Sequence, residues 1–158
     1  MKKIVLALVL LALVPALAEA ATLFVMRHAE DLDEGRDPVL TEEGQRRAER
    51  LAAMLVDAGV EFILSSDYHR TRDTVAPLAG ALGLEVELYD PRDLPGLVEE
   101  LAERDARGVI VGHSNTTPAL VELLGGEPGE PIDELEFDRL YILDPGCEDE
   151  VATVRLRY

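Results

Sequence analysis

The sequence predicts an α/β protein, a three-layer α/β/α sandwich with helices on both faces of a mostly parallel sheet. From residue 23 to residue 124, short apolar segments of strand length alternate with amphipathic segments of helical length. Two further apolar segments, at 139–143 and 151–156, follow one another without a helix between them. We expect these two to form an antiparallel pair at one edge of the sheet. A length of 158 residues suits a single folded domain.

The first strand is expected at 23–26, where four apolar residues lead directly into Arg27 and His28. A polar loop follows. The next helix is expected to begin after Thr41, because a threonine followed by acidic residues is typical of a helix start. Apolar residues then recur at helical spacing, and Gly59 is expected to end this segment.

The rest of the chain continues the alternation. The expected elements, in order, are a strand at 61–64, a helix at His69–Leu82, a strand at 84–88, a helix at 94–104, a strand at 109–111 and a helix at 116–124. The polar residues at 65–67 are expected to cap the helix at His69. The strand at 109–111 is apolar throughout, so we expect it at the centre of the sheet.

The first twenty residues are typical of a signal peptide rather than of a folded element. Lys2 and Lys3 precede an unbroken apolar run at 4–14, which is too short for a comfortable membrane span. Small residues then fit a cleavage site after Ala18 or after Ala20. We therefore expect a signal peptide at 1–20, a domain at 21–158, a periplasmic or secreted location and no stable membrane insertion once the signal is removed. An uncleaved anchor is the alternative.

Composition argues against nucleic acid as a partner. The formal net charge is -17, so the surface repels phosphate backbones. Aromatic residues make up 4% of the chain and tryptophan is absent, which leaves few platforms on which bases could stack. Any anionic ligand must therefore be held by cations concentrated at one place.

Three strand ends carry such cations and imidazoles. Arg27 and His28 follow the first strand, Arg70 follows the second, and His113 and Asn115 follow the strand at 109–111. Parallel strands bring their carboxyl ends to one edge of the sheet, where ligands bind in open α/β folds. Guanidinium groups bind phosphate oxygens in bidentate fashion, and an imidazole can attack phosphorus. The pattern predicts a phosphoryl-transfer site.

The same residues resemble the motifs of the histidine phosphatase superfamily, which includes the phosphoglycerate mutases and the small phosphohistidine phosphatases. The family's Arg-His-Gly signature stands here as Arg27-His28-Ala29. Its serine-rich loop, with an arginine five residues into it, appears as 65–70, and its second histidine appears in 111–115. The segment 40–45 resembles the start of the family's first helix. The resemblance covers essentially the whole of 21–158 and favours the small branch.

The resemblance implies a phosphoglycerate mutase-like fold and a role for each matching residue. His28 would be the nucleophile and phosphohistidine carrier, and Arg27 and Arg70 would clamp the phosphoryl oxygens. His113 would be the second histidine of the pocket. Asn115 would touch the phosphoryl group or cap the helix that follows. The resemblance implies no cofactor and no metal.

The general acid that protonates the leaving group is not assigned by the sequence. Asp90 and Asp93 lie in a polar segment between the second motif and the second histidine, and Glu30 lies beside the nucleophile. The simpler explanation, a solvated loop residue, is favoured for each of these carboxylates.

These observations predict a metal-independent phosphatase that hydrolyses phosphomonoesters, or a phosphoprotein, through a phosphohistidine on His28. The short loops favour hydrolysis over mutase chemistry. Two alternatives remain open. One is a non-catalytic relative that binds or senses phosphoesters. The other is a metal site formed by His28, His69 and His113.

Overall fold

The computed structural model describes residues 21–32, 34–146 and 151–158, so the expected signal peptide at 1–20 lies outside the described residues. The elements in chain order are β1 (Leu23–Arg27), α1 (Glu42–Leu55), β2 (Phe62–Ser66), α2 (His69–Leu82), β3 (Val86–Tyr89), α3 (Leu94–Ala102), β4 (Gly108–Gly112), α4 (Thr116–Leu123), β5 (Arg139–Asp144) and β6 (Ala152–Arg157). In this described part, no helix combines the length and apolarity needed to cross a membrane.

The strands form one mixed sheet in the order β3-β2-β4-β1-β5-β6. The first four strands of this order pair in parallel, whereas β5 pairs antiparallel with both β1 and β6. The predicted fold class, a mostly parallel sheet with an antiparallel edge pair, is therefore confirmed. The apolar strand β4 lies between β1 and β2, in the central position that its composition predicted.

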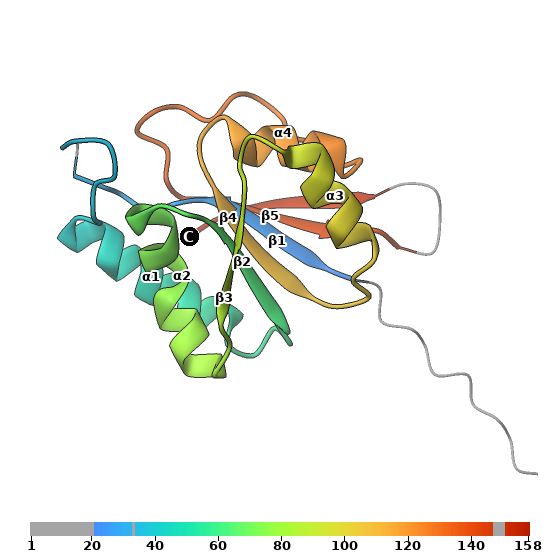
Figure 1. Cartoon of the computed structure of the whole chain (residues 1–158), viewed down its shortest axis with the longest axis horizontal. Coiled ribbons are helices and arrows are strands. Elements are labelled where there is room, and N and C mark those ends of the chain that lie inside the picture. Colours follow the sequence, from blue (N-terminus) through green and yellow to red (C-terminus); the bar gives the residue numbers. More distant parts are fainter. Residues whose placement is uncertain (1–20, 33, 147–150) are drawn as a thin grey trace, which may run out of the picture.

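Helices cover both faces of the sheet, with α1 and α2 on one face and α3 and α4 on the other (Figure 1). Alternate residues of β1 face the two layers. Phe24 and Met26 belong to the core cluster that includes residues of α1 and α2, whereas Leu23 and Val25 belong to the cluster that includes residues of α3 and α4. Both strand faces are buried, which is why β1 and β4 read as continuous apolar runs.

The start of α2 differs from the expectation. Ser66 is the last residue of β2, and the N-cap residue Tyr68 makes no side-chain capping hydrogen bond, so the prediction that 65–67 caps this helix is wrong. The backbone N–H of His69 instead donates to Oδ1 of Asp37 at 2.7 Å. A carboxylate 32 positions away in the sequence therefore replaces the local cap.

The strand expected at 84–88 is shifted by one to two residues, because β3 spans Val86–Tyr89. Gly83 ends α2 in the left-handed conformation, as predicted, and the N–H of Leu84 then bonds back to the carbonyl of Ala79 at 3.0 Å. Because its N–H is bonded to the end of the helix, Leu84 does not pair in the sheet. Tyr89 joins it instead, paired with Ser66.

Helix α1 packs closely against the segment that follows β1. Thr41 caps the helix as predicted by accepting from the N–H of Gly44 at 3.0 Å, and its own N–H donates to the carbonyl of Glu30 at 2.9 Å. A Cβ at Gly44 would lie 2.1 Å from that carbonyl oxygen. The absence of a side chain at Gly44 therefore lets α1 fix the backbone that follows the Arg27-His28 pair.

We predict that Gly44→Ala lowers the free energy of unfolding by about 1–3 kcal/mol, because the added methyl group overlaps backbone atoms that cannot rotate away. Gly80→Ala is the matched control, since Gly80 also lies in a helix but a Cβ there meets no atom within 4 Å. It should be neutral or slightly stabilising. Urea denaturation of both variants tests this, and equal stability of the two would contradict the close packing at Gly44.

Candidate active site

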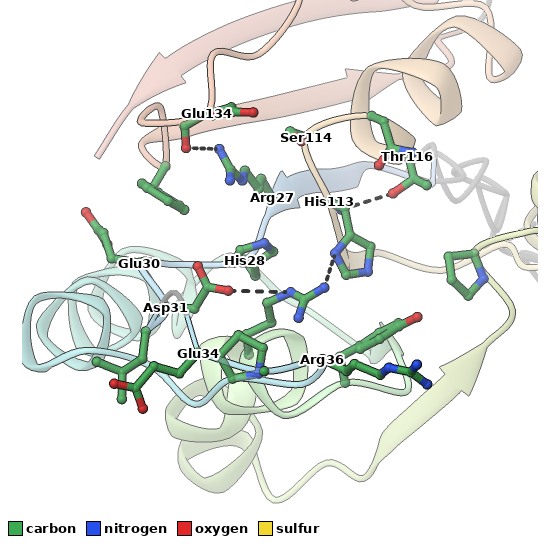
Figure 2. Close-up of a pocket in the computed structure, with 18 of the residues that line it drawn as sticks. Arg27, His28, Glu30, Asp31, Glu34, Arg36, His113, Ser114, Thr116 and Glu134 are labelled. Carbon is green, nitrogen blue, oxygen red and sulfur yellow. Dashed lines mark hydrogen bonds and ion pairs between the residues drawn. The ribbon is translucent and has the colours of Figure 1, made fainter.

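The pairing of β1 with β4 brings the two predicted histidines together. Arg27 is in register with Gly112, and the N–H of His28 donates to the carbonyl of Gly112 at 2.9 Å. His28 and His113 therefore follow neighbouring strand ends, with ring centroids 5.5 Å apart and ring planes at 64° (Figure 2). The sheet, rather than a flexible loop, sets their relative position.

These residues lie in a cavity of about 880 Å³ at the carboxyl ends of the parallel strands. Its lining residues come from five parts of the described chain: the end of β1 and the loop after it, the start of α2, and the segments after β3, after β4 and before β5. Arg27, His28, Arg70, His113 and Asn115 all line it. Every residue that the sequence predicted for catalysis or phosphate binding therefore reaches one cavity, while the roles themselves stay predictions.

His28 is held as a neutral imidazole. Its side chain is buried, and Nδ1 lies 2.8 Å from the carbonyl oxygen of Ala29. Because a carbonyl only accepts, Nδ1 carries the proton and Nε2 carries the lone pair. Burial lowers the pKa of His28 to about 4, and the charges of Arg27 and Arg70 act in the same direction. A neutral imidazole with one free lone pair is the form that can attack phosphorus.

His113 is also held in one tautomer. Nη2 of Arg70 lies 3.5 Å from its Nδ1, so Nδ1 faces a group that can only donate. Nε2 then donates to Oγ of Ser66 at 2.9 Å, and Ser66 donates onward to Oγ1 of Thr71 at 3.1 Å. Burial lowers the pKa of His113 to about 4, reinforced by His28 and the two arginines. The sequence placed Ser66 in a motif but did not indicate this contact.

Arg27 is buried and only part of its guanidinium faces the cavity. Nη1 donates to three backbone carbonyls, those of Asp133 and Glu134 at 2.9 Å and that of Glu136 at 3.1 Å. The guanidinium also lies 4.0 Å from the ring centroid of Phe137. Arg27 therefore both lines the cavity and holds the wall segment 133–137 in place.

Arg70 approaches the same point from the start of α2. Its Nε lies 3.8 Å from Oδ2 of Asp31, and its guanidinium lies 4.7 Å from the ring centroid of Tyr68. Its position is supported by Thr74, whose hydroxyl donates to the carbonyl of Arg70 at 2.7 Å and accepts from the N–H of Ala29 at 2.8 Å. Thr74 thus ties the first motif to the second, a link that sequence reasoning missed.

Asn115 lies at the N-cap of α4, as the capping alternative expected, but its side chain makes no capping hydrogen bond. The hydroxyl of Thr116 accepts from the N–H of His113 at 3.0 Å, which ties the start of α4 to the second histidine. The Asn115 side chain lines the cavity beside the N-terminal end of α4, where the helix dipole favours an anion.

Of the three candidate acids, only Glu30 lines the cavity. Burial alone would raise its pKa, but three hydrogen bonds from Arg47, at 2.6–3.0 Å, hold that pKa below the usual range. Asp90 pairs with Arg92 through two contacts at 2.9 Å, which lower its pKa. Asp93 caps α3. None of these three carboxylates is poised to donate a proton.

The structure does not gather the histidines into a metal site. His69 is exposed, does not line the cavity and lies 3.9 Å from Asp37, whereas His28 and His113 adjoin each other. Within the described residues, no group of three or more His, Cys, Asp or Glu side chains is arranged to hold a metal ion.

Comparison with known proteins agrees with this geometry. The model of the histidine phosphatase superfamily (branch 1) matches residues 23–91. No curated protein sequence matches the chain.

Among solved structures, the protein histidine phosphatase SixA complexed with tungstate is 18% identical, with a TM-score of 0.68, over 86% of this chain and 96% of that one. The putative phosphohistidine phosphatase SixA from Agrobacterium tumefaciens is 22% identical, with a TM-score of 0.68, over 88% and 99%. A putative alpha-ribazole-5'-P phosphatase from Escherichia coli K-12 is 16% identical, with a TM-score of 0.71, over 88% and 97%. These likenesses establish the fold.

Residues 23–91 therefore match the histidine phosphatase superfamily (branch 1), and the fold is similar to that of solved histidine phosphatases. The matched segment contains the first motif and the arginine of the second, and the fold likeness extends through the second histidine. Family and fold together support a phosphatase.

The two neutral imidazoles predict a pH dependence of stability. The pKa of His28 and of His113 is about 4 in the folded chain and about 6.5 in an unfolded one. Between these values only the unfolded chain takes up the protons, so stability should fall as the pH is lowered from 6.5 towards 4. The loss should reach roughly 1–2 kcal/mol per imidazole by pH 5.

Urea denaturation at pH 7, 6 and 5 measures this loss. The double variant His28→Asn/His113→Asn is the reference, and it should show a flatter dependence over this range. Parallel pH profiles for the two proteins would show that the imidazoles are not held neutral by the fold.

Proposed function

We propose that this protein is a phosphatase that hydrolyses phosphomonoesters of small molecules, or a phosphoprotein, through a phosphohistidine on His28. The observation that carries this proposal is the state of His28 itself. It is neutral, its proton is fixed on Nδ1 by Ala29, and it adjoins Arg27, Arg70 and His113 in one cavity.

The proposed reaction has two steps. Nε2 of His28 attacks phosphorus, the N–P bond forms, and the bond from phosphorus to the leaving oxygen breaks. Water then attacks the phosphohistidine, the N–P bond breaks, and phosphate leaves. Arg27 and Arg70 lie beside the oxygens on which charge accumulates, so these two cations stabilise the transition state without a metal ion, with the neutral His113 next to them.

We also propose that the protein acts outside the cytoplasm. The support is the sequence of residues 1–20, with its two lysines, its apolar run and its small residues at 18 and 20. Cell fractionation, with the mass of the recovered protein, tests this proposal.

We predict that His28→Ala abolishes formation of an acid-labile phosphoenzyme and lowers turnover to background. His69→Ala should behave as wild type, because His69 is exposed and does not line the cavity. Incubation with a ³²P-labelled phosphomonoester in the presence of EDTA, followed by denaturation and alkaline electrophoresis, measures the intermediate. Phosphate binding without any labelled wild-type protein would favour the non-catalytic relative, and loss of label with EDTA would favour a metal site.

We further predict that Arg70→Ala lowers kcat/KM by about 10²–10³, or on the order of 2.7–4 kcal/mol of barrier. Arg70→Lys should keep part of the binding of inorganic phosphate but lose much of kcat, because lysine keeps the charge without the planar fork. Arg72→Ala is the control, since Arg72 pairs with Asp67 and does not line the cavity. Wild-type kinetics and unchanged phosphate inhibition in Arg70→Ala would remove Arg70 from the site.

A further inference from the structure

We infer that Asp31 is the acid-base residue of this site: it protonates the leaving oxygen and later takes the proton of the attacking water. The inference rests on the proposed function and adds to it the group that the sequence left unassigned. Asp31 is not one of the three carboxylates that the sequence offered for this role.

The position of Asp31 is fixed by the fold. It lies three residues after His28 and forms an isolated antiparallel bridge with Leu40, just before α1 begins. Its side chain is only 20% exposed and lines the cavity. Figure 2 shows Asp31 in the same cavity as His28, and its Oδ2 lies 3.8 Å from Nε of Arg70.

The other carboxylates on the cavity wall are less suited. Glu30 is held by its three hydrogen bonds from Arg47. The side chains of Glu34 and Glu134 point away from His28 in Figure 2. Among the described carboxylates that line the cavity, Asp31 is therefore the one that faces Arg70, a predicted phosphate ligand.

Asp31 alone supplies the proton needed in the first step and recovers a proton in the second. As Nε2 of His28 attacks phosphorus, the protonated Asp31 carboxyl gives its proton to the leaving oxygen, and an alcohol departs. Asp31 is then a carboxylate. It accepts a proton from the water that attacks the phosphohistidine, the N–P bond breaks, phosphate leaves, and the protonated carboxyl is restored.

The contact with Arg70 puts Asp31 next to the proposed phosphoryl position. In the free site the carboxylate of Asp31 faces the guanidinium of Arg70. A phosphoryl group that binds this guanidinium would therefore lie beside the Asp31 carboxyl group.

The test compares a good leaving group with a poor one. For Asp31→Asn, kcat/KM with p-nitrophenyl phosphate should stay within about threefold of wild type, because nitrophenolate leaves without a proton. With glycerol phosphate, kcat/KM should fall by about 10²–10⁴. Asp90→Asn is the matched control, since Asp90 is exposed and outside the cavity wall, and it should leave both values unchanged.

The second step gives an independent readout. With p-nitrophenyl phosphate, Asp31→Asn should release one burst of nitrophenolate per active site and accumulate phosphohistidine, because the base for water is gone. In Asp31→Ala, added formate should restore turnover of the phosphohistidine by supplying a small carboxylate. Rescue of this kind is not expected if Asp31 only orients Arg70.

An equal fall in kcat/KM for the two substrates, without burst or formate rescue, would overturn the inference and leave Asp31 as a positioning residue for Arg70. Full activity of Asp31→Asn on glycerol phosphate would overturn it as well. Absence of turnover and of phosphohistidine in the wild-type protein is a different outcome. It would overturn the proposed function, and the role of Asp31 with it.

Discussion

The hydrogen-bonded register between β1 and β4 is the constraint on which the rest of the site depends. Arg27 pairs with Gly112, so the residues that follow each strand, His28 and His113, emerge side by side. A slip of one residue would move the side chains of a strand to the opposite face. A Cβ at Gly112 would lie 2.8 Å from the hydroxyl oxygens of Thr116 and Tyr89, so a side chain at this strand end would displace at least one of these groups.

The charge of the arginines in the cavity is opposite in sign to the net charge of the whole molecule. The chain carries a formal net charge of -17, yet the substrate proposed for the cavity is a dianion. Both imidazoles are neutral, so the positive charge closest to the reacting atoms comes from Arg27 and Arg70. Keeping the imidazoles uncharged preserves a nucleophile, and the arginines, which remain charged at all accessible pH values, supply the attraction.

The strand ends could be predicted from the sequence because two local rules are enough: apolar runs become strands, and parallel strands bring their carboxyl ends together. The cap of α2 could not, because Asp37 reaches His69 across 32 positions. The acceptors of Arg27 were equally hidden, since backbone carbonyls 106–109 positions away have no sequence signature. The sequence did not single out Asp31, because it lies in an acidic stretch whose carboxylates cannot be distinguished without the fold.

The two hydrogen bonds of the Thr74 hydroxyl have a consequence for how such a protein changes over evolutionary time. This hydroxyl joins the backbone after His28 to the backbone of Arg70, so these two parts of the site are linked directly. The walls at 34–38, 91–92 and 134–137 come from other connecting segments. Insertions or exchanges there can reshape the space for the leaving group while the nucleophile keeps its geometry. Loops grafted into these segments are therefore expected to change the substrate preference. The residues proposed to contact phosphorus would stay in place.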